Sequence, residues 1–219
     1  MVAQVGATEA TRTRHPKLLR VALKRAFDLI ASGGALVLLS PFLLVIGLLI
    51  RLDGGPALFA QRRIGRDGRV FHCLKFRTMA EDAEARLQTL LDDDPALAER
   101  YRIYKKLDVD PRITEIGAFL RKTSLDELPQ LLNVITGEMS LIGPRPMMEN
   151  ELDDYGPAFA EYRAVRPGIT GLWQVSGRNT TTFAERARLD QRYVQTWSLL
   201  GDLRILALTV REVVAGSGR

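Results

Sequence analysis

The sequence predicts a mainly α-helical protein with a few short strands, an α+β fold, attached to a membrane by an apolar helix near its N-terminus. Two observations carry this prediction: a long uncharged segment follows Asp28, and later segments show helical spacing of apolar residues, while only one alternates. With 219 residues, 46% hydrophobic and 26% charged, the chain suits one packed domain and an appendage. We expect a mobile leader over residues 1–16, a membrane helix over 17–51 and a compact domain over 52–219.

The charged and metal-binding residues limit the classes of partner. A net charge of +5 and a pI near 9.6 favour anionic partners, such as nucleic acid, acidic lipid headgroups or a phosphate-bearing substrate. Cys73 is the only cysteine, which excludes an internal disulfide, and with His15 and His72 as the only histidines a zinc site is not expected. A metal ion would instead be magnesium or manganese, held by carboxylate and phosphate oxygens.

The first predicted element is the apolar helix. Residues from Leu29 to Ile50 carry no charge and would extend roughly 33 Å as a straight helix, enough to cross a hydrocarbon core. A buried core helix and a signal peptide are the alternatives. A core helix is rarely apolar on every side in so small a protein, and the segment is not followed by a small-residue cleavage site.

Two features indicate how this helix lies in the membrane. Basic residues flank it on both sides, so a simple crossing would place one cluster on the unfavourable side. The flanking residues are Lys17, Arg20, Lys24 and Arg25 before the segment and Arg51, Arg62, Arg63, Arg66 and Arg69 after it. Ser40-Pro41 stands at the centre, where proline removes a backbone donor. We expect a re-entrant helix, broken there, that returns to the face from which it entered; a spanning helix with an internal proline is the alternative.

The next three elements follow in order. Residues 69–79 read as an extended segment whose alternation places Lys75 and Arg77 on one face. Residues 80–107 read as charged, solvated helices with a break near Asp94-Pro95, and a short helix opens at Thr114.

The remaining chain alternates helices with irregular stretches. A helix beginning after Ser124 ends near Thr136-Gly137, and Gly- and Pro-rich stretches over 137–146 and 166–178 exclude long elements there. Further helices are predicted over 148–164, interrupted at Gly156-Pro157, and over 181–197, where Thr182 and Glu185 form a capping box. The last helix, 202–214, carries an apolar stripe of Leu203, Leu206, Val210 and Val213. The stripe fits a membrane interface or a core equally well.

Asp126 and Glu127, side by side near the centre of the chain, have two readings. Ser124 and Glu127 have capping-box spacing, and acidic residues in a first turn are favoured by the helix dipole. The second reading is a reacting centre, in which an ionised Asp126 attacks phosphorus and Glu127 holds a divalent ion that bridges diphosphate oxygens. The sequence shows no phosphate-binding loop, dinucleotide fingerprint or HExxH motif that would compete for this chemistry.

Cations elsewhere in the sequence support the second reading. Arg121 and Lys122 lie just upstream of the acidic pair, Lys75 and Arg77 share a face, and Arg145 stands between two prolines that restrict its backbone. A restricted guanidinium suits phosphate binding. Ordinary solvated surface cations are the alternative. We interpret the acidic pair as both a helix start and a reacting centre.

Three long motifs identify a known family. The segments "KFRTM", "DPRITEIGAFLRKTSLDELPQLLNVITGEMSLIGPRP" and "RPGITGLWQVSGR", preceded by the apolar segment with Ser-Pro at its centre, resemble the bacterial sugar transferases, the polyprenol-phosphate (monotopic) phosphoglycosyl transferases. The resemblance covers roughly residues 17–215, and we expect the chain to correspond to the catalytic part of the larger members. It implies transfer of a sugar 1-phosphate from a UDP-sugar to undecaprenyl phosphate, with release of UMP, which initiates exopolysaccharide or other surface-glycan assembly.

The resemblance also assigns roles to matching residues. Asp126 matches the nucleophile that forms a covalent phosphosugar intermediate in a ping-pong reaction, and Glu127 matches its partner, associated with Mg²⁺. Arg121 matches an arginine that organises the site. Basic positions of the family's motifs, assigned to phosphates, are matched by Lys75, Arg77 and Arg145. Ser40-Pro41 matches the break of the family's re-entrant helix.

The expected setting follows from the same resemblance. It implies a monotopic protein of the bacterial inner membrane with its catalytic domain on the cytoplasmic face, in contact with acidic lipids and with downstream glycosyltransferases as further partners. Two other functions stay open: a non-catalytic membrane scaffold of a glycan pathway, and a magnesium-dependent hydrolase of nucleotide sugars. Nucleic acid is not an expected partner, because the basic residues lie largely around the apolar segment.

Overall fold

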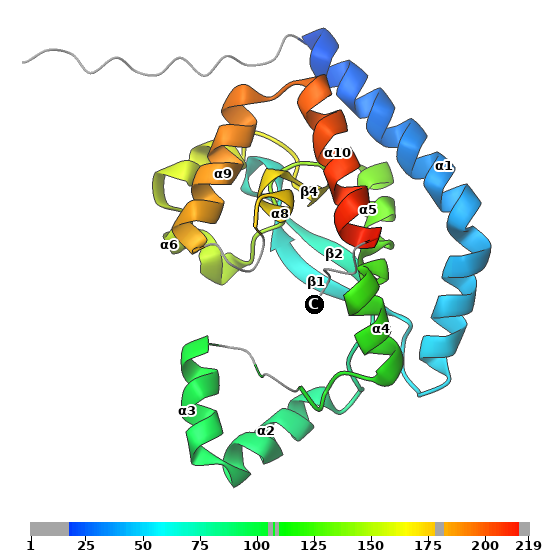
Figure 1. Ribbon diagram of the computed structural model, residues 1–219, viewed down its shortest axis with the longest axis vertical. Helices are drawn as coiled ribbons and strands as arrows, with labels where there is room; N and C mark the ends of the chain where they lie inside the picture. Colours follow the sequence, from blue (N-terminus) through cyan, green and yellow to red (C-terminus); the bar gives the residue numbers. More distant parts are fainter. Residues whose placement is uncertain (1–17, 105–106, 108–109, 178–181, 215–219) are drawn as a thin grey trace, which may run out of the picture.

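The computed structural model describes residues 18–104, 107, 110–177 and 182–214, so the predicted leader over 1–16 lies outside the described residues. Helices dominate, and the strands form two small sheets, which confirms the predicted mainly α fold with a few short strands (Figure 1). The elements in chain order are α1 (Leu18–Arg51), β1 (Leu58–Ile64), η1 (Arg66–Gly68), β2 (Val70–Phe76), α2 (Ala83–Asp93), α3 (Pro95–Tyr104), α4 (Glu115–Thr123), η2 (Leu125–Glu127), α5 (Gln130–Thr136), β3 (Ser140–Ile142), η3 (Glu149–Glu151), α6 (Leu152–Tyr155), η4 (Gly156–Ala158), α7 (Phe159–Tyr162), β4 (Gly168–Thr170), α8 (Leu172–Val175), α9 (Phe183–Thr196) and α10 (Leu199–Val214).

Helix α1 is continuous over 34 residues, with Pro41 inside it. Pro41 has no amide hydrogen for the carbonyl of Val37 one turn earlier, and the Ser40 hydroxyl donates to that carbonyl instead, at 2.8 Å. Figure 1 shows that α1 curves along its length. The predicted break at Ser40-Pro41 is therefore wrong: α1 is continuous there, because the Ser40 hydroxyl supplies the donor that Pro41 lacks. The return of α1 to its entry face stays a prediction.

The first half of α1 is attached to the rest of the protein by polar contacts. Lys24 forms an ion pair of 2.7 Å with Asp202 at the start of α10. Arg25 donates to the carbonyl of Val134 at the end of α5, at 2.6 Å. Asp28, 2% exposed, accepts a hydrogen bond from a β3 amide. These contacts fix the start of α1, while its second half carries the more exposed apolar residues.

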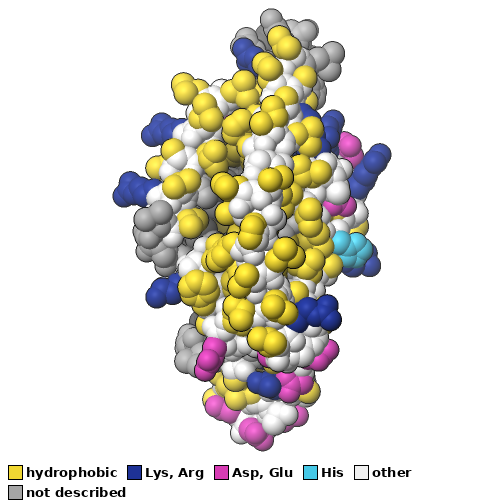
Figure 2. Space-filling view, turned by 90° about the vertical axis from the view of Figure 1, so that its right-hand side faces the viewer, with side chains coloured by type: hydrophobic (Ala, Val, Ile, Leu, Met, Phe, Trp, Pro, Cys, Tyr) yellow, Lys and Arg dark blue, Asp and Glu magenta, His cyan; other side chains and the backbone are white. Residues whose placement is uncertain are grey.

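Apolar side chains form an extended outer surface. On α1, Val37, Leu38 and Leu44 are 78%, 80% and 73% exposed, and on α10, Leu203 and Val210 are also exposed. Figure 2 shows hydrophobic side chains gathered along this side of the molecule, with Lys and Arg at its edges. Within the described part of the chain, α1 alone is long and apolar enough to cross a membrane. The surface is consistent with membrane association.

The stripe predicted on the last helix faces outward. Leu203, Val210 and Val213 are exposed, whereas Ile205 of the same helix is buried. Leu206, the fourth residue of the predicted stripe, is half-buried. Three of the four stripe residues therefore face away from the core, and Ile205 marks the side of α10 that packs against it. An outward apolar stripe fits an interfacial helix.

The β1–β2 hairpin carries one side of the candidate site. It pairs antiparallel from Leu58 opposite Phe76 to Ile64 opposite Val70, and β1 was not predicted from the sequence. Asn133 on α5 accepts from the β2 amide of Leu74 and donates to a β2 carbonyl, at 2.9 and 2.8 Å. These bonds join α5 to β2 and bring together two segments that are about 60 residues apart in the sequence.

The second sheet brings the two Gly- and Pro-rich stretches together. Strands β3 and β4 pair parallel, and the backbone just after β3 lies very close to β4 and to the residue that follows it. A Cβ atom on Gly168 would lie 2.1 Å from the amide nitrogen of Gly143, and one on Gly171 would lie 2.0 Å from the Gly143 carbonyl oxygen. Only glycine allows this approach. It places the loop with Arg145 beside α8, which carries Trp173.

Candidate active site

Asp126 and Glu127 lie in η2, between α4 and α5. Ser124 adopts the left-handed conformation (φ 57°), its amide closes α4, and its side chain makes no capping hydrogen bond. The predicted Ser124–Glu127 capping box is therefore wrong. The left-handed turn redirects the Ser124 side chain, and the Glu127 side chain bonds to Lys75 instead. Because η2 is a three-residue 3₁₀ turn, the helix-dipole argument does not apply to it.

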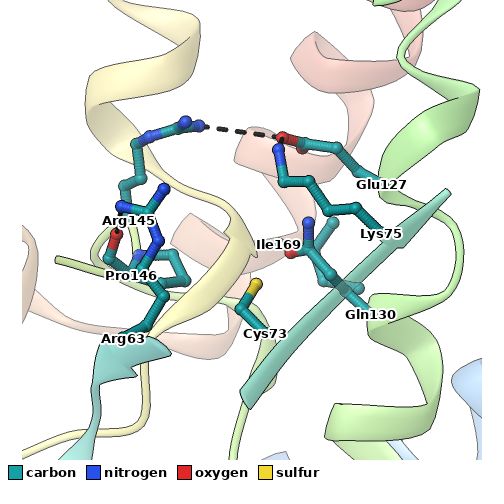
Figure 3. A pocket seen from close by; sticks show the side chains of 8 residues that line it. All are labelled: Arg63, Cys73, Lys75, Glu127, Gln130, Arg145, Pro146 and Ile169. Atoms are coloured by element: carbon teal, nitrogen blue, oxygen red, sulfur yellow. Dashed lines mark hydrogen bonds and ion pairs between the residues drawn. The ribbon is translucent and has the colours of Figure 1, made fainter. Parts of the chain in front are cut away.

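Lys75 on β2 joins the two carboxylates. Its ammonium nitrogen lies 2.7 Å from Glu127 Oε1 and 3.7 Å from Asp126 Oδ2. Arg145 approaches the same Glu127 oxygen at 3.8 Å. Figure 3 shows the Lys75 and Arg145 side chains converging on Glu127. The structure thus brings together four of the predicted site residues from three separate segments of the chain.

Asp126 is largely withdrawn from solvent, with 9% of its surface exposed. Burial raises the pKa of its carboxyl above the usual range, and the negative charge of Glu127 adds to the increase. The positive charges of Lys75 and Arg121 oppose it. Burial is the largest of these influences, while the cations favour the ionised form that a nucleophilic role would require.

These residues line a cleft of about 850 Å³. The predicted residues in its lining are Lys75, Arg77, Arg121, Asp126, Glu127 and Arg145. A recess of about 10 Å³ adjoins the cleft at Lys75, Glu127 and Arg145, which line both (Figure 3). The cleft is large enough for a phosphorylated sugar with part of its nucleotide.

Arg121 and Arg77 are fixed differently at the cleft wall. Arg121 on α4 donates through Nε to the Thr78 hydroxyl at 2.9 Å. Arg77 is 9% exposed and binds the end of α1, donating to the carbonyls of Ile50, at 2.9 Å, and Gly54, and pairing with Asp53 at 2.6 Å. The guanidinium that was predicted to bind substrate therefore also holds the turn after the apolar helix beside the cleft.

The cleft wall also contains residues to which the sequence analysis assigned no role. Thr78, Arg112, Trp173 and Gln174 are among them. Trp173 had a usable signal, because a large aromatic residue within a Gly-rich stretch cannot be explained by helix or strand patterning. Thr78 lies in "KFRTM" and Arg112 in the segment that begins "DPRITEIG", and neither residue type stands out from its neighbours.

The donor set limits the kind of metal ion that this site could hold. The described residues contain no cluster of three or more His, Cys, Asp or Glu side chains, so a cage made only of protein ligands is absent from them. One or two carboxylates with substrate phosphates are the ligands that Mg²⁺ commonly takes in proteins. Glu127, the predicted metal residue, fits that mode, in which substrate oxygens and water would complete the coordination.

A buried Asp126 and a half-buried Glu127 lie among cations in a cleft whose Arg77 is tied to the end of the long apolar helix. This arrangement defines the class: an enzyme that acts on anionic substrates. Comparison with known proteins agrees. The family model described as bacterial sugar transferase matches residues 19–216. The chain therefore belongs to the bacterial sugar transferase family.

Individual relatives are similar over most of this chain. The exopolysaccharide production protein ExoY of Sinorhizobium fredii is 52% identical over 196 residues, 89% of this chain and 87% of the relative. The UDP-galactose-lipid carrier transferase of Erwinia amylovora is 47% identical over 90% of this chain and 41% of its own length. The undecaprenyl-phosphate galactose phosphotransferase of Salmonella typhimurium is 44% identical, with the same two coverages. The match thus takes in nearly all of the shorter relative and less than half of the two longer ones.

Proposed function

We propose that this protein is a phosphoglycosyl transferase that moves a sugar 1-phosphate from a UDP-sugar to undecaprenyl phosphate and releases UMP. The reaction would initiate assembly of an exopolysaccharide or another bacterial surface glycan. The observation that carries the proposal is the buried Asp126 beside Glu127 and Lys75 in a cleft of suitable size. The names of the relatives, which specify UDP-galactose, a lipid carrier and undecaprenyl phosphate, support the choice of substrates.

The proposed reaction has two displacements at one phosphorus atom. In the first, an Asp126 carboxylate oxygen bonds to the β-phosphorus of the UDP-sugar. The bond from that phosphorus to the bridging oxygen breaks, and UMP leaves with the oxygen and its electron pair. In the second, a phosphate oxygen of undecaprenyl phosphate bonds to the same phosphorus and displaces Asp126. The products are the undecaprenyl diphosphate sugar and a regenerated carboxylate.

The neighbouring side chains have matching tasks in this proposal. Lys75 keeps Asp126 ionised in spite of its burial, from a distance of 3.7 Å. Glu127 would hold Mg²⁺, or Mn²⁺, and such an ion would supply positive charge to offset the charge of the leaving group. Arg121 and Arg145 bind phosphate oxygens from the cleft wall. Arg77 keeps the end of α1 beside the reacting centre.

The membrane arrangement is part of the proposal. The polyprenyl chain of the acceptor stays in the bilayer, since each buried CH₂ is worth about 0.8 kcal/mol. A re-entrant α1, bent at Ser40-Pro41, would hold the cleft at the headgroup plane on the cytoplasmic face of the inner membrane, where UDP-sugars are made. The basic residues on both sides of the apolar segment would bind acidic lipids.

Isotope labelling tests the covalent mechanism. Full-length protein in lipid nanodiscs with Mg²⁺ is mixed with UDP-sugars labelled on the β-phosphate, without acceptor lipid. We expect label on the denatured wild type, none on Asp126→Asn, and its release on addition of undecaprenyl phosphate. UMP release only in the presence of lipid and without label would replace the two displacements by a direct one. Sustained UMP release without lipid would indicate a hydrolase, and no label or UMP with any sugar would favour a scaffold.

A labelling experiment of a different kind tests the topology. Single cysteines replace Arg20 and Leu52, both exposed in the structure, while the natural Cys73 is buried. A re-entrant α1 predicts that a membrane-impermeant maleimide modifies both positions in inside-out vesicles and neither in right-side-out vesicles. Modification of the two positions from opposite sides would show that α1 spans the bilayer.

A further inference from the structure

Trp173 and Arg186 contact Arg145 at the edge of the cleft, and the proposed reaction gives neither of them a role. The guanidinium carbon of Arg145 lies 5.8 Å from the centre of the Trp173 ring, and that of Arg186 lies 5.1 Å from the same ring. Both distances are within the range of cation–π attraction. Trp173 and Arg145 line the cleft, whereas Arg186 on α9 is only 6% exposed.

Arg186 is fixed by the protein core. Its guanidinium donates to Glu151 at 3.4 Å, lies 3.9 Å from Asp190, and stacks 5.1 Å from the ring of Phe183. Two carboxylates therefore balance the charge of this buried cation. The same guanidinium donates to the main-chain carbonyl of Arg145, at 3.4 Å. One immobile side chain thus contacts both the backbone of Arg145 and the ring that carries its guanidinium.

Arg145 is consequently held at two points. Its backbone lies between two prolines and accepts the bond from Arg186, and its guanidinium rests over Trp173. The same guanidinium faces Glu127 at 3.8 Å (Figure 3). A free arginine side chain loses much of its rotamer freedom when it binds a ligand. Holding it in place beforehand lowers that cost.

We propose that Trp173 and Arg186 are positioning residues that hold the Arg145 guanidinium in the orientation that binds the diphosphate of the nucleotide sugar. This inference rests on the proposed function, because it takes a UDP-sugar as the ligand. The contacts favour support of Arg145 over stacking on the uracil base, since two guanidinium groups already contact the indole ring. Trp173 acts through Arg145, so its effect appears in nucleotide binding.

A double-mutant cycle measures this dependence. Binding of UDP to the full-length protein in nanodiscs is followed by calorimetry for the wild type, Trp173→Leu, Arg145→Met and the double variant. We expect Trp173→Leu to weaken binding about 5- to 10-fold in the wild-type background and less than about twofold in the Arg145→Met background. Trp173→Phe keeps an aromatic ring and should stay within about threefold of the wild type. A side chain with a merely structural role would not show this coupling.

Other results would overturn the inference in identifiable ways. Equal weakening by Trp173→Leu in both backgrounds would show that the ring acts independently of Arg145. Uridine has the base but no phosphate. If Trp173→Leu binds uridine more weakly than the wild type does, the ring contacts the base. The Trp173 variants carry the test because removal of Arg186 leaves Glu151 and Asp190 without their cation. If the wild type binds UDP but the cycle shows no coupling between Trp173 and Arg145, only this inference is wrong. If the wild type fails to bind UDP or to release UMP, the proposed function is wrong.

Discussion

Asp126 and Asp190 are both buried aspartates beside a cation, but Asp126 lines the cleft and Asp190 lies in the protein interior. Asp190 is 1% exposed, accepts a hydrogen bond from Tyr155, and lies 3.9 Å from Arg186. Asp126 lines the cleft, with Lys75 at 3.7 Å. Burial raises the pKa of both carboxyls, that of Asp190 to about 6. A raised pKa therefore does not separate a reacting carboxylate from a structural one; access to a substrate-sized cleft does.

The largest expected difference between the two aspartates is catalytic. Asp126→Asn removes the proposed nucleophile while keeping the side-chain volume, so we expect UMP release to fall by about 10³-fold or more with an unchanged unfolding temperature. Asp190→Asn, the matched control, should retain turnover within about tenfold, since Asp190 does not line the cleft and is connected to Arg145 only through Arg186. Comparable losses of UMP release in both variants would show that Asp126 and Asp190 do not differ in catalytic role.

Loss of Lys75 should produce the next largest effect and should reveal its cause. We expect Lys75→Met to lower kcat/KM by about 10²-fold at neutral pH. Asp126 must be ionised to react, so the rate of the wild type falls as pH drops through the raised pKa of this group. Without Lys75 that pKa rises further, and the acidic limb of the pH–rate profile should move to higher pH. A loss of rate with an unmoved limb would show that Lys75 does not act on the ionisation of Asp126.

Asp190 should instead control stability as a function of pH. Its pKa is about 6 in the folded protein, above the usual value of 3.8, so the folded state binds the proton more tightly. The stabilisation from this group is complete below pH 3.8 and is lost as pH rises through 6. Relative to Asp190→Asn, the free energy of unfolding of the wild type should fall by about 3 kcal/mol or less between pH 4 and pH 7. Urea unfolding in detergent at several pH values measures this, and a difference that does not change with pH would contradict it.

The smallest expected effect comes from the packing of α4, the helix before Asp126, against Thr78 of the cleft wall. A Cβ atom on Gly117 of α4 would lie 2.0 Å from the carbonyl oxygen of Thr78, so Gly117→Ala must move α4 away from the cleft wall. We expect a loss of about 1–3 kcal/mol in unfolding free energy and reduced turnover. Gly34→Ala is the control, because a Cβ atom there meets nothing within 4 Å among the described residues. Thermal unfolding of both variants shows whether the close approach is required; an equal response would argue against it.

Several elements were predictable because their signals are local. The α2–α3 break at Asp94-Pro95, the Thr114 cap of α4 and the Thr182–Glu185 capping box all appear where the sequence places them. Each depends on neighbours within a few residues. The Ser124–Glu127 pattern had the same local form and failed, since Glu127 bonds to Lys75, which is 52 residues away, and Ser124 takes a left-handed conformation. A long-range contact overrode the local preference.

The sequence by itself determined the long apolar helix, the acidic pair with its basic motifs and the family, because these are properties of composition and of residues close together in the chain. Only the tertiary structure decided which cation meets which carboxylate. Lys75 reaches Glu127, Arg77 is tied to the end of α1, and the support of Arg145 by Trp173 and Arg186 joins segments 28 to 41 residues apart. The physical reason is that such contacts arise from the packing of distant segments around shared cores, which local preferences do not specify.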